Sequence, residues 1–212
     1  MIDRFEATRV VIEVVGSAPI IGAVGNATFD LSAFDRPTNF YMWNSMGMAS
    51  SVALGLALAR PDLRIVCLDG DGALLMNLGS LATTSMSGVR NLVHVVWDNG
   101  GWDITGGQPA GSPFGVDLEM IARGSGFART ATVKDLDAFR GALESAMRDD
   151  ERWCIVAHIE SGSSSFRPSK DAAFIRDRMT REVAALPPRS DGPPGRAARS
   201  GSPRRAPRPE RR

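Results

Sequence analysis

The sequence predicts an α/β domain in which helices cover both faces of a doubly wound, mostly parallel sheet. Two short runs, residues 64–68 and 91–97, are apolar and rich in β-branched side chains, as expected of strands that are buried on both faces. Segments with the apolar spacing of helices lie between and around such runs. Strands that alternate with helices are joined by right-handed crossovers, which place a parallel sheet between two helical layers.

The length and composition suit one domain followed by a tail. A chain of 212 residues that is 43% hydrophobic and 23% charged can bury a substantial core. We assign residues 1–186 to this domain and residues 187–212 to a disordered tail, which holds eight arginines, two acidic residues and seven of the 13 prolines. Because such a segment buries too little apolar surface to offset its ordering entropy, we interpret it as a solvated extension. Binding of nucleic acid by its arginine clusters is the less favoured interpretation.

The sequence shows no sign of secretion or of membrane insertion. The two cysteines, Cys67 and Cys154, lie in apolar runs and are interpreted as small buried side chains without disulfide or metal-binding spacing. The first residues lack the apolar core of a signal peptide, and no run approaches the ~18 apolar residues of a spanning helix. We therefore expect a cytoplasmic protein without a membrane partner.

The remaining elements follow from periodicity and from helix-terminating residues. The N-terminal ones are a helix over residues 3–15, a strand over 19–24, an aromatic-rich loop over 29–43, a helix that begins within 44–51 and stops at Pro61, and a helix over 73–87. Glycine, proline and serine break regular structure from residue 107 to residue 115. The C-terminal elements are helices over 118–124 and 136–147 with N-caps Asp117 and Asp135, a strand over 153–159, and an amphipathic helix over 170–186.

Two oxygen-bearing side chains follow the two buried strands. Asp71 lies in the turn Gly70-Asp71-Gly72 after the first strand, where the glycines let the backbone approach a ligand closely. Asn99 follows the second strand. Ligands of open α/β sheets bind beyond the carboxyl ends of the strands, and Asp and Asn supply the oxygen ligands that Mg²⁺ prefers. The arrangement predicts a site for a metal ion and a diphosphate.

These residues resemble the signature of thiamine-diphosphate enzymes, a Gly-Asp-Gly turn followed at a characteristic interval by Asn. Here 26 residues separate Gly72 from Asn99. A Gly-Asp-Gly turn alone is common, but the two-point motif at two strand ends favours the cofactor over a structural turn. The resemblance implies that Mg²⁺ is held by Asp71, the amide oxygen of Asn99 and the carbonyl of Gly101. The other cofactor contacts that it implies in this region are Gly70, Gly72, Ala73, Trp102 and Asp103.

A second segment, Asn44-Ser45-Met46-Gly47, resembles the family segment that precedes a helix and contacts the cofactor rings. The resemblance implies that Met46 wedges between the two rings and that the carbonyl of Asn44 faces the aminopyrimidine. Asn44 stands where the family has Gly. The alternative is that Met46 only fills the core at a helix start.

More narrowly, the chain is similar to the β subunits of sulfopyruvate decarboxylases and to the C-terminal half of phosphonopyruvate decarboxylases. The similar stretches, within residues 3–170, are 39–42, 46–51, 67–73 and Thr105-Gly106-Gly107-Gln108. The similarity implies a non-oxidative 2-oxo-acid decarboxylase. Met48 stands where relatives have His, and Thr28-Phe29-Asp30-Leu31 where they have an Arg-Glu pair. Both departures remove polar groups that an acidic substrate would contact, so a phosphono or sulfo substrate stays open.

The resemblance also implies a partner. In the family, a Glu from a separate pyrimidine-binding domain activates the cofactor. The length of this chain accommodates one diphosphate-binding domain and no second domain of that kind. We therefore expect a separate α subunit that supplies this Glu. The alternatives are a carboligase, the β subunit of a 2-oxoacid oxidoreductase, or a half-domain without turnover. Two isolated cysteines argue against the iron–sulfur cluster typical of the oxidoreductases.

Four further polar or aromatic positions receive structural interpretations. His94 and His158 lie in predicted strands and are expected to be satisfied core histidines. Asp69 is expected to tie the turn that follows it, and Trp102 to pack as a lid over the metal loop. For Asp103, contact with substrate and contact with solvent both stay open.

Overall fold

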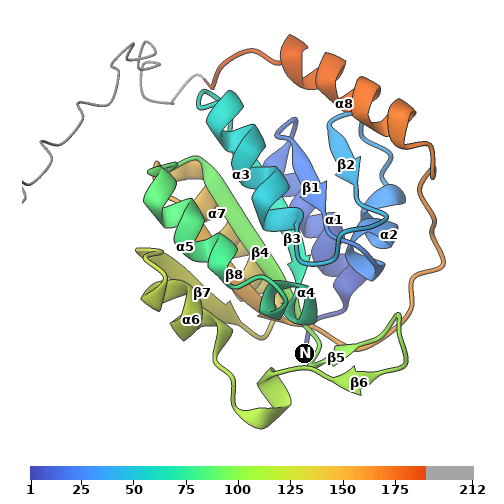
Figure 1. Ribbon diagram of the computed structural model, residues 1–212, viewed down its shortest axis with the longest axis vertical. Coiled ribbons are helices and arrows are strands. Elements are labelled where there is room, and N and C mark those ends of the chain that lie inside the picture. The colour runs from blue at the N-terminus through green and yellow to red at the C-terminus, as the bar shows by residue number, and fades with distance from the viewer. Residues whose placement is uncertain (190–212) are drawn as a thin grey trace, which may run out of the picture.

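The computed structural model describes residues 1–189, and a parallel sheet of six strands runs through their centre (Figure 1). The strands are β1 (Ile20–Gly22), β2 (Asn39–Tyr41), β3 (Ile65–Gly70), β4 (Leu92–Asp98), β7 (Arg129–Val133) and β8 (Trp153–His158). Their order is β2-β1-β3-β4-β8-β7, and all neighbours pair in parallel. The chain passes from β1 outward to the edge strand β2, returns to β3 beside β1, and then continues through β4 toward β8 and β7. The doubly wound fold predicted from the sequence is therefore confirmed.

Helices cover both faces of the sheet. They are α1 (Arg4–Val15), α2 (Asn26–Ser32), α3 (Ala49–Ala59), α4 (Asp71–Leu75), α5 (Gly79–Ser87), α6 (Leu118–Gly124), α7 (Leu136–Arg148) and α8 (Ala172–Ala185), with a 3₁₀ turn at Ser112–Phe114. Apolar side chains of α1, α2 and α7 pack in one core cluster, and those of α3 and α8, or of α4, α5 and α6, pack in two others. Figure 1 shows α3 and α5 in front of the sheet and α7 behind it.

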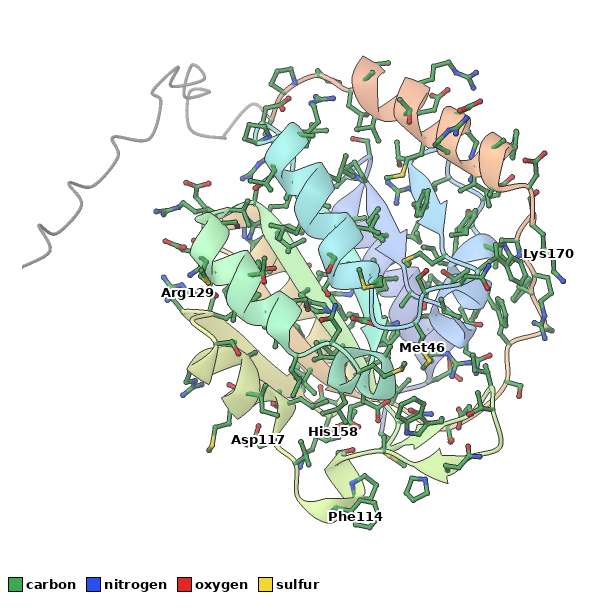
Figure 2. All side chains as sticks on the ribbon, viewed as in Figure 1. Met46, Phe114, Asp117, Arg129, His158 and Lys170 are labelled. Atoms are coloured by element: carbon green, nitrogen blue, oxygen red, sulfur yellow. The ribbon has the colours of Figure 1, made fainter. Side chains whose placement is uncertain are left out.

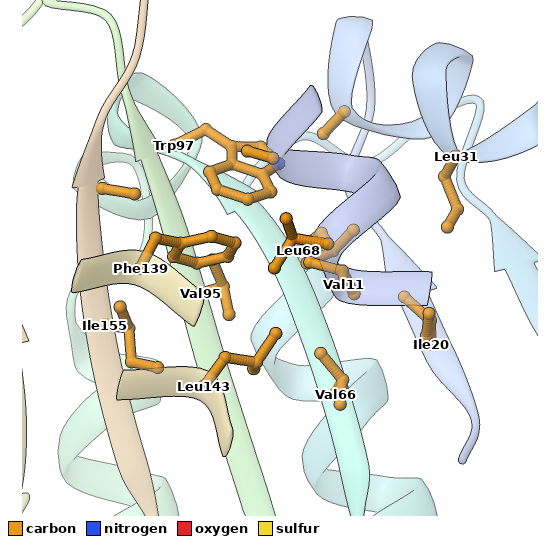
Figure 3. Packing of buried hydrophobic residues seen from close by; sticks show 14 of the residues in the cluster. Val11, Ile20, Leu31, Val66, Leu68, Val95, Trp97, Phe139, Leu143 and Ile155 are labelled. Carbon is orange, nitrogen blue, oxygen red and sulfur yellow. The ribbon is translucent and has the colours of Figure 1, made fainter. Parts of the chain in front are cut away.

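The core follows from the alternation of side chains along the central strands. Val66 and Leu68 of β3 point toward α1 and α7, where Phe139 packs against Trp97 with ring centroids 5.3 Å apart (Figure 3). Cys67, on the opposite face of β3, belongs to the cluster under α3. Because β3 and β4 are buried on both faces, they hold their carboxyl ends rigidly beside each other.

Two expectations about elements were wrong. Residues 29–43, expected to be a loop, contain most of α2 and all of β2. Both elements are short, and β2 is an edge strand of three residues, so neither produces a detectable periodicity. The helix expected over residues 73–87 is two helices, α4 and α5, and α4 begins at Asp71 itself. The break lies near Asn77, whose amide donates a hydrogen bond of 3.0 Å to the carbonyl of Gly47.

Two strand pairings were not foreseen. The edge strand β7 has a largely exposed sequence, Arg-Thr-Ala-Thr-Val, without the apolar character of the central strands. A small antiparallel hairpin pairs β5 (Gly101–Trp102) with β6 (Gln108–Pro109). β6 lies at the start of the loop expected over residues 107–115, and β5 precedes that loop. The predicted N-caps are confirmed, because Asp117 accepts from the amide of Met120 and Asp135 from that of Ala138.

The structure also shows the state of the two cysteines and the lengths of the helices in residues 1–189. Cys67 and Cys154 are both buried and free, as predicted. No helix among residues 1–189 is long and apolar enough to cross a membrane. Of the predicted disordered tail, residues 190–212 lie outside the described part of the chain.

Candidate functional site

A cavity opens beyond the carboxyl ends of β1, β3 and β4. Most of the cofactor-binding residues predicted from the sequence line this cavity. The expected cofactor residues that line it are Met46, Gly70, Asp71, Gly72, Ala73, Asn99, Gly101, Trp102 and Asp103. Asn44 and Ser45 are exposed and are not among its lining residues. Asp71 and Asn99, which follow two neighbouring parallel strands, therefore lie at the same cavity, as expected of residues at the carboxyl ends of such strands.

Asp71 is the most unusual group in this cavity. Its side chain is buried at the start of α4, and Oδ1 accepts a hydrogen bond of 2.8 Å from the amide of Gly72. The second oxygen, Oδ2, is buried and has no hydrogen-bond partner among the residues that the structure describes. Burial, with a contribution from the neighbouring Asp98 carboxylate, raises the pKa of Asp71 to about 7. A buried carboxylate oxygen without a partner lowers stability, and a cation beside it would remove that penalty.

The loop after β4 is braced by Asp98. Its Oδ1 accepts hydrogen bonds from the amide of Gly100 at 3.1 Å and the hydroxyl of Ser112 at 2.6 Å. Asn99, the next residue, lines the cavity, and its amide oxygen accepts a long bond of 3.4 Å from the amide of Gly101. Oxygens from Asp71, Asn99 and the Gly101 backbone are the donor set that Mg²⁺ prefers, so the residues present fit this ion.

His158 is not the core histidine that was expected. Its side chain is 32% exposed, and Nδ1 lies 3.5 Å from Oδ2 of the buried Asp98. It is the last residue of β8, where the sheet ends and periodicity no longer determines burial. Figure 2 shows His158 and Met46 toward the same end of the sheet. For His94, the expected burial is confirmed, but the side chain is only partly satisfied, because Nδ1 has no hydrogen-bond partner among the described residues.

Met46 reaches the cavity because its loop turns tightly. Ser45 has a φ of 65° and Gly47 a φ of 87°, both in the left-handed region. A Cβ on Gly47 would lie 3.1 Å from the carbonyl oxygen of Ala73, so the loop runs close against α4. Met46 is half-buried and lines the cavity instead of filling one of the apolar clusters.

Trp102 packs directly on the turn that carries Asp71. A Cβ built on Gly72 would lie 2.9 Å from Cε2 of Trp102, so the indole rests on the bare glycine backbone. The packing expected of Trp102 is therefore present. It fixes the β5–β6 hairpin against the start of α4.

The substitution Gly72→Ala is expected to destabilise the chain by about 1–3 kcal/mol, because the added methyl group overlaps the Trp102 ring. Thermal unfolding of the variant measures this effect. Gly79→Ala serves as the matched control, since a Cβ at Gly79 meets no atom within 4 Å. Equal melting temperatures for Gly72→Ala and wild type would contradict the packing.

Asp103 lines the cavity and is partly exposed, and its carboxylate also binds a distant segment of the chain. Its two carboxylate oxygens accept hydrogen bonds of 2.6 Å from the hydroxyl of Ser161 and 2.9 Å from the amide of Gly162. Asn26 holds the same segment, donating to the carbonyl of Gly162 and accepting from the amide of Ser164. Asp103 thus ties the chain that leaves β8 to the rim of the cavity.

Several other lining residues were not predicted from the sequence. Arg4 is buried, lines the cavity and forms an ion pair of 2.7 Å with the buried Asp30. An arginine in a first helical turn is common on surfaces, so no local pattern distinguishes it. Asn26 and Ile104 also line the cavity without a recognisable motif.

The raised pKa of Asp71 predicts a pH dependence of stability. In the metal-free folded chain, the carboxyl keeps its proton up to about pH 7, whereas the ordinary value is 3.8. Between these values the folded state binds more protons than the unfolded state, so this group makes the free energy of unfolding fall as the pH rises. We expect Asp71→Asn to remove this contribution. The melting temperatures of wild type and Asp71→Asn are measured in chelator at pH 5 and at pH 8. If the change in melting temperature between the two pH values were the same for both proteins, the burial of the charge would be contradicted.

Known proteins are similar to most of the length of this chain. A family model described as "Thiamine pyrophosphate enzyme, C-terminal TPP binding domain" matches residues 21–157. The chain is 40% identical over 185 residues to the sulfopyruvate decarboxylase subunit beta of Methanothermobacter thermautotrophicus, covering 86% of this chain and 96% of the relative. It is 36% identical over 189 residues to the phosphonopyruvate decarboxylase of Streptomyces viridochromogenes, covering 88% of this chain. The match covers 47% of that enzyme, so the chain spans about half its length.

Solved structures share the fold. A thiamin diphosphate-dependent enzyme from Mycobacterium smegmatis superposes with a TM-score of 0.65 at 23% identity. The match covers 76% of this chain and 32% of that one. At this level of identity the likeness concerns the fold alone.

Proposed function

The chain belongs to the family of C-terminal TPP-binding domains of thiamine pyrophosphate enzymes, and from this premise we propose that it is the cofactor-binding subunit of a 2-oxo-acid decarboxylase. Thiamine pyrophosphate is the thiamine diphosphate of the sequence motif. The observation that carries the proposal is the buried Oδ2 of Asp71, which has no hydrogen-bond partner in the described part of the chain. Asp71 lines the same cavity as Asn99 and Gly101. The domain that performs this function comprises residues 1–186.

In this proposal the chain holds the anionic end of the cofactor. Asp71, the amide oxygen of Asn99 and the carbonyl of Gly101 bind Mg²⁺, and the diphosphate supplies further oxygen ligands. Gly70, Gly72 and Ala73 would border the diphosphate, and Met46, which lines the same cavity, would contact the cofactor rings. The indole of Trp102 packs on Gly72 and supports the turn that carries Asp71.

The bound cofactor accepts the electrons that a 2-oxo acid releases when it loses CO₂. The contribution of this chain is to fix the cofactor and to exclude water from one side of it. The relatives named for sulfopyruvate and phosphonopyruvate make a 2-oxo acid with a second acidic group the first substrate class to test.

A separate α subunit with a pyrimidine-binding domain completes the site. Two observations support this part of the proposal. The chain matches nearly the full length of a protein named as a β subunit, and only half of a phosphonopyruvate decarboxylase. Large apolar side chains are also exposed on segments that frame the cavity, as expected of a surface that a partner covers: Met48, Met76, Ile104 and Phe114.

The experiment is co-expression with the product of a neighbouring gene of about 170 residues, the size of one domain. CO₂ release from a panel of 2-oxo acids is then measured with Mg²⁺ and thiamine diphosphate. A decarboxylase releases CO₂ without an electron acceptor. Release that depends on ferredoxin or a dye would instead indicate an oxidoreductase, and a coupled product would indicate a carboligase.

A further inference from the structure

A buried polar pair joins the two strands that end in the proposed metal ligands. Nε2 of His94, on β4, lies 3.2 Å from Oδ2 of Asp69, on β3, and neither residue has exposed surface. The other oxygen of Asp69, Oδ1, accepts a hydrogen bond of 3.0 Å from the amide of Gly70. The next residue is Asp71, so a continuous chain of contacts runs from His94 to the turn of the metal site.

This pair is not required by the packing around it. The cross-strand neighbours of His94 are Cys67 and Cys154, both buried and weakly polar. Nδ1 of His94 is buried and has no hydrogen-bond partner in the described part of the chain. A buried polar pair with an unsatisfied nitrogen lowers stability compared with apolar side chains of similar size. A role at the site explains why the pair lies there.

The pair is not itself a convincing metal centre. Ligand atoms of Cys67, Asp69 and His94 lie within 4.8 Å of one another. Burial raises the pKa of the Cys67 thiol well above its usual range, however, and a protonated thiol is a poor metal ligand. All three residues are fully buried, which leaves an ion no entry path.

We propose that His94 is a positioning residue that holds Asp69 against the Gly70 amide and thereby aligns Asp71 with Asn99. The inference rests on the proposed function. Backbone pairing between β3 and β4 ends at Gly70 and Trp97, so it does not reach the two ligand side chains. The His94–Asp69 contact fixes the orientation of the Gly70 peptide, and that peptide determines where α4 begins and where the Asp71 side chain points. Removing such supporting contacts typically weakens metal binding about 10–100-fold.

Two nearly isosteric substitutions test this role. His94→Gln places an amide nitrogen near the position of Nε2, whereas the shorter His94→Asn reaches only the position of Nδ1. Affinity for Mn²⁺ in the presence of thiamine diphosphate is measured on the full chain by electron paramagnetic resonance. We expect His94→Asn to bind at least about ten-fold more weakly than wild type, and His94→Gln to remain within about three-fold.

A control separates positioning from stability. Val95→Ala, in the core cluster on the opposite face of β4, lowers the melting temperature by creating a cavity but leaves the contact of His94 with Asp69 intact. We expect its Mn²⁺ affinity to equal that of wild type. Wild-type affinity in His94→Asn, or an equal loss in Val95→Ala, would overturn the positioning role while leaving the proposed function in place. Absence of Mn²⁺ binding in wild type would overturn both.

Discussion

Replacing Asp71 by alanine is expected to abolish Mg²⁺-dependent binding of thiamine diphosphate, with an affinity loss of about 100-fold or more. Asp71 contributes a carboxylate whose Oδ2 is buried and has no hydrogen-bond partner within residues 1–189, so this oxygen is available to a cation. Removing the only proposed anionic ligand leaves the amide of Asn99 and a backbone carbonyl, which together attract Mg²⁺ weakly. A 100-fold loss corresponds to about 2.7 kcal/mol. Calorimetric titration of the cofactor at saturating Mg²⁺ measures it.

The matched control for this substitution is Asp117→Ala. It removes an exposed carboxylate that caps α6, so the net charge changes equally while the cavity is untouched. We expect cofactor affinity to stay at the wild-type value and the melting temperature to fall slightly through loss of the cap. An Asp71→Ala variant that binds as tightly as Asp117→Ala would refute the metal assignment.

The second large effect concerns the partner. The chain alone, saturated with Mg²⁺ and thiamine diphosphate, is expected to give no 2-oxo-acid decarboxylation above the rate in buffer. Among the described residues that line the cavity, no glutamate is present, so the proposed function assigns the activating glutamate to the α subunit. Adding the α subunit is expected to restore turnover.

CO₂ release during stepwise addition of the α subunit measures this dependence. The activity is expected to rise until the two chains are equimolar and then to level off. An α subunit in which the activating Glu is replaced by Gln provides the control, because it is expected to assemble with this chain without restoring activity. Turnover by the purified chain alone would contradict the shared site.

The fold and the convergence of Asp71 and Asn99 on one cavity could be predicted because each leaves a local pattern in the sequence. The apolar runs of β3 and β4 mark fully buried strands, and a parallel sheet necessarily brings their carboxyl ends together. Asp71 and Asn99 follow those ends directly, so their convergence follows from topology alone.

Other features depend on contacts between distant segments, for which one sequence holds no pattern. Asp103 binds Ser161 and Gly162, which are 58 and 59 residues away, so its role could not be foreseen. Arg4 meets Asp30 only because α1 and α2 pack on the same face of the sheet. The burial of His158 was predicted wrongly, because a strand pattern does not reveal which terminal residue reaches solvent.

The most direct test of the central claim is a titration of the wild-type chain, together with its α subunit, with thiamine diphosphate and with thiamine. The account predicts that thiamine diphosphate binds in the presence of Mg²⁺, that chelation of the metal releases it, and that thiamine, which lacks the diphosphate, binds far more weakly under both conditions. Equal binding of thiamine and thiamine diphosphate, or binding unaffected by chelator, would contradict the claim that this chain holds the diphosphate through a metal ion at Asp71 and Asn99.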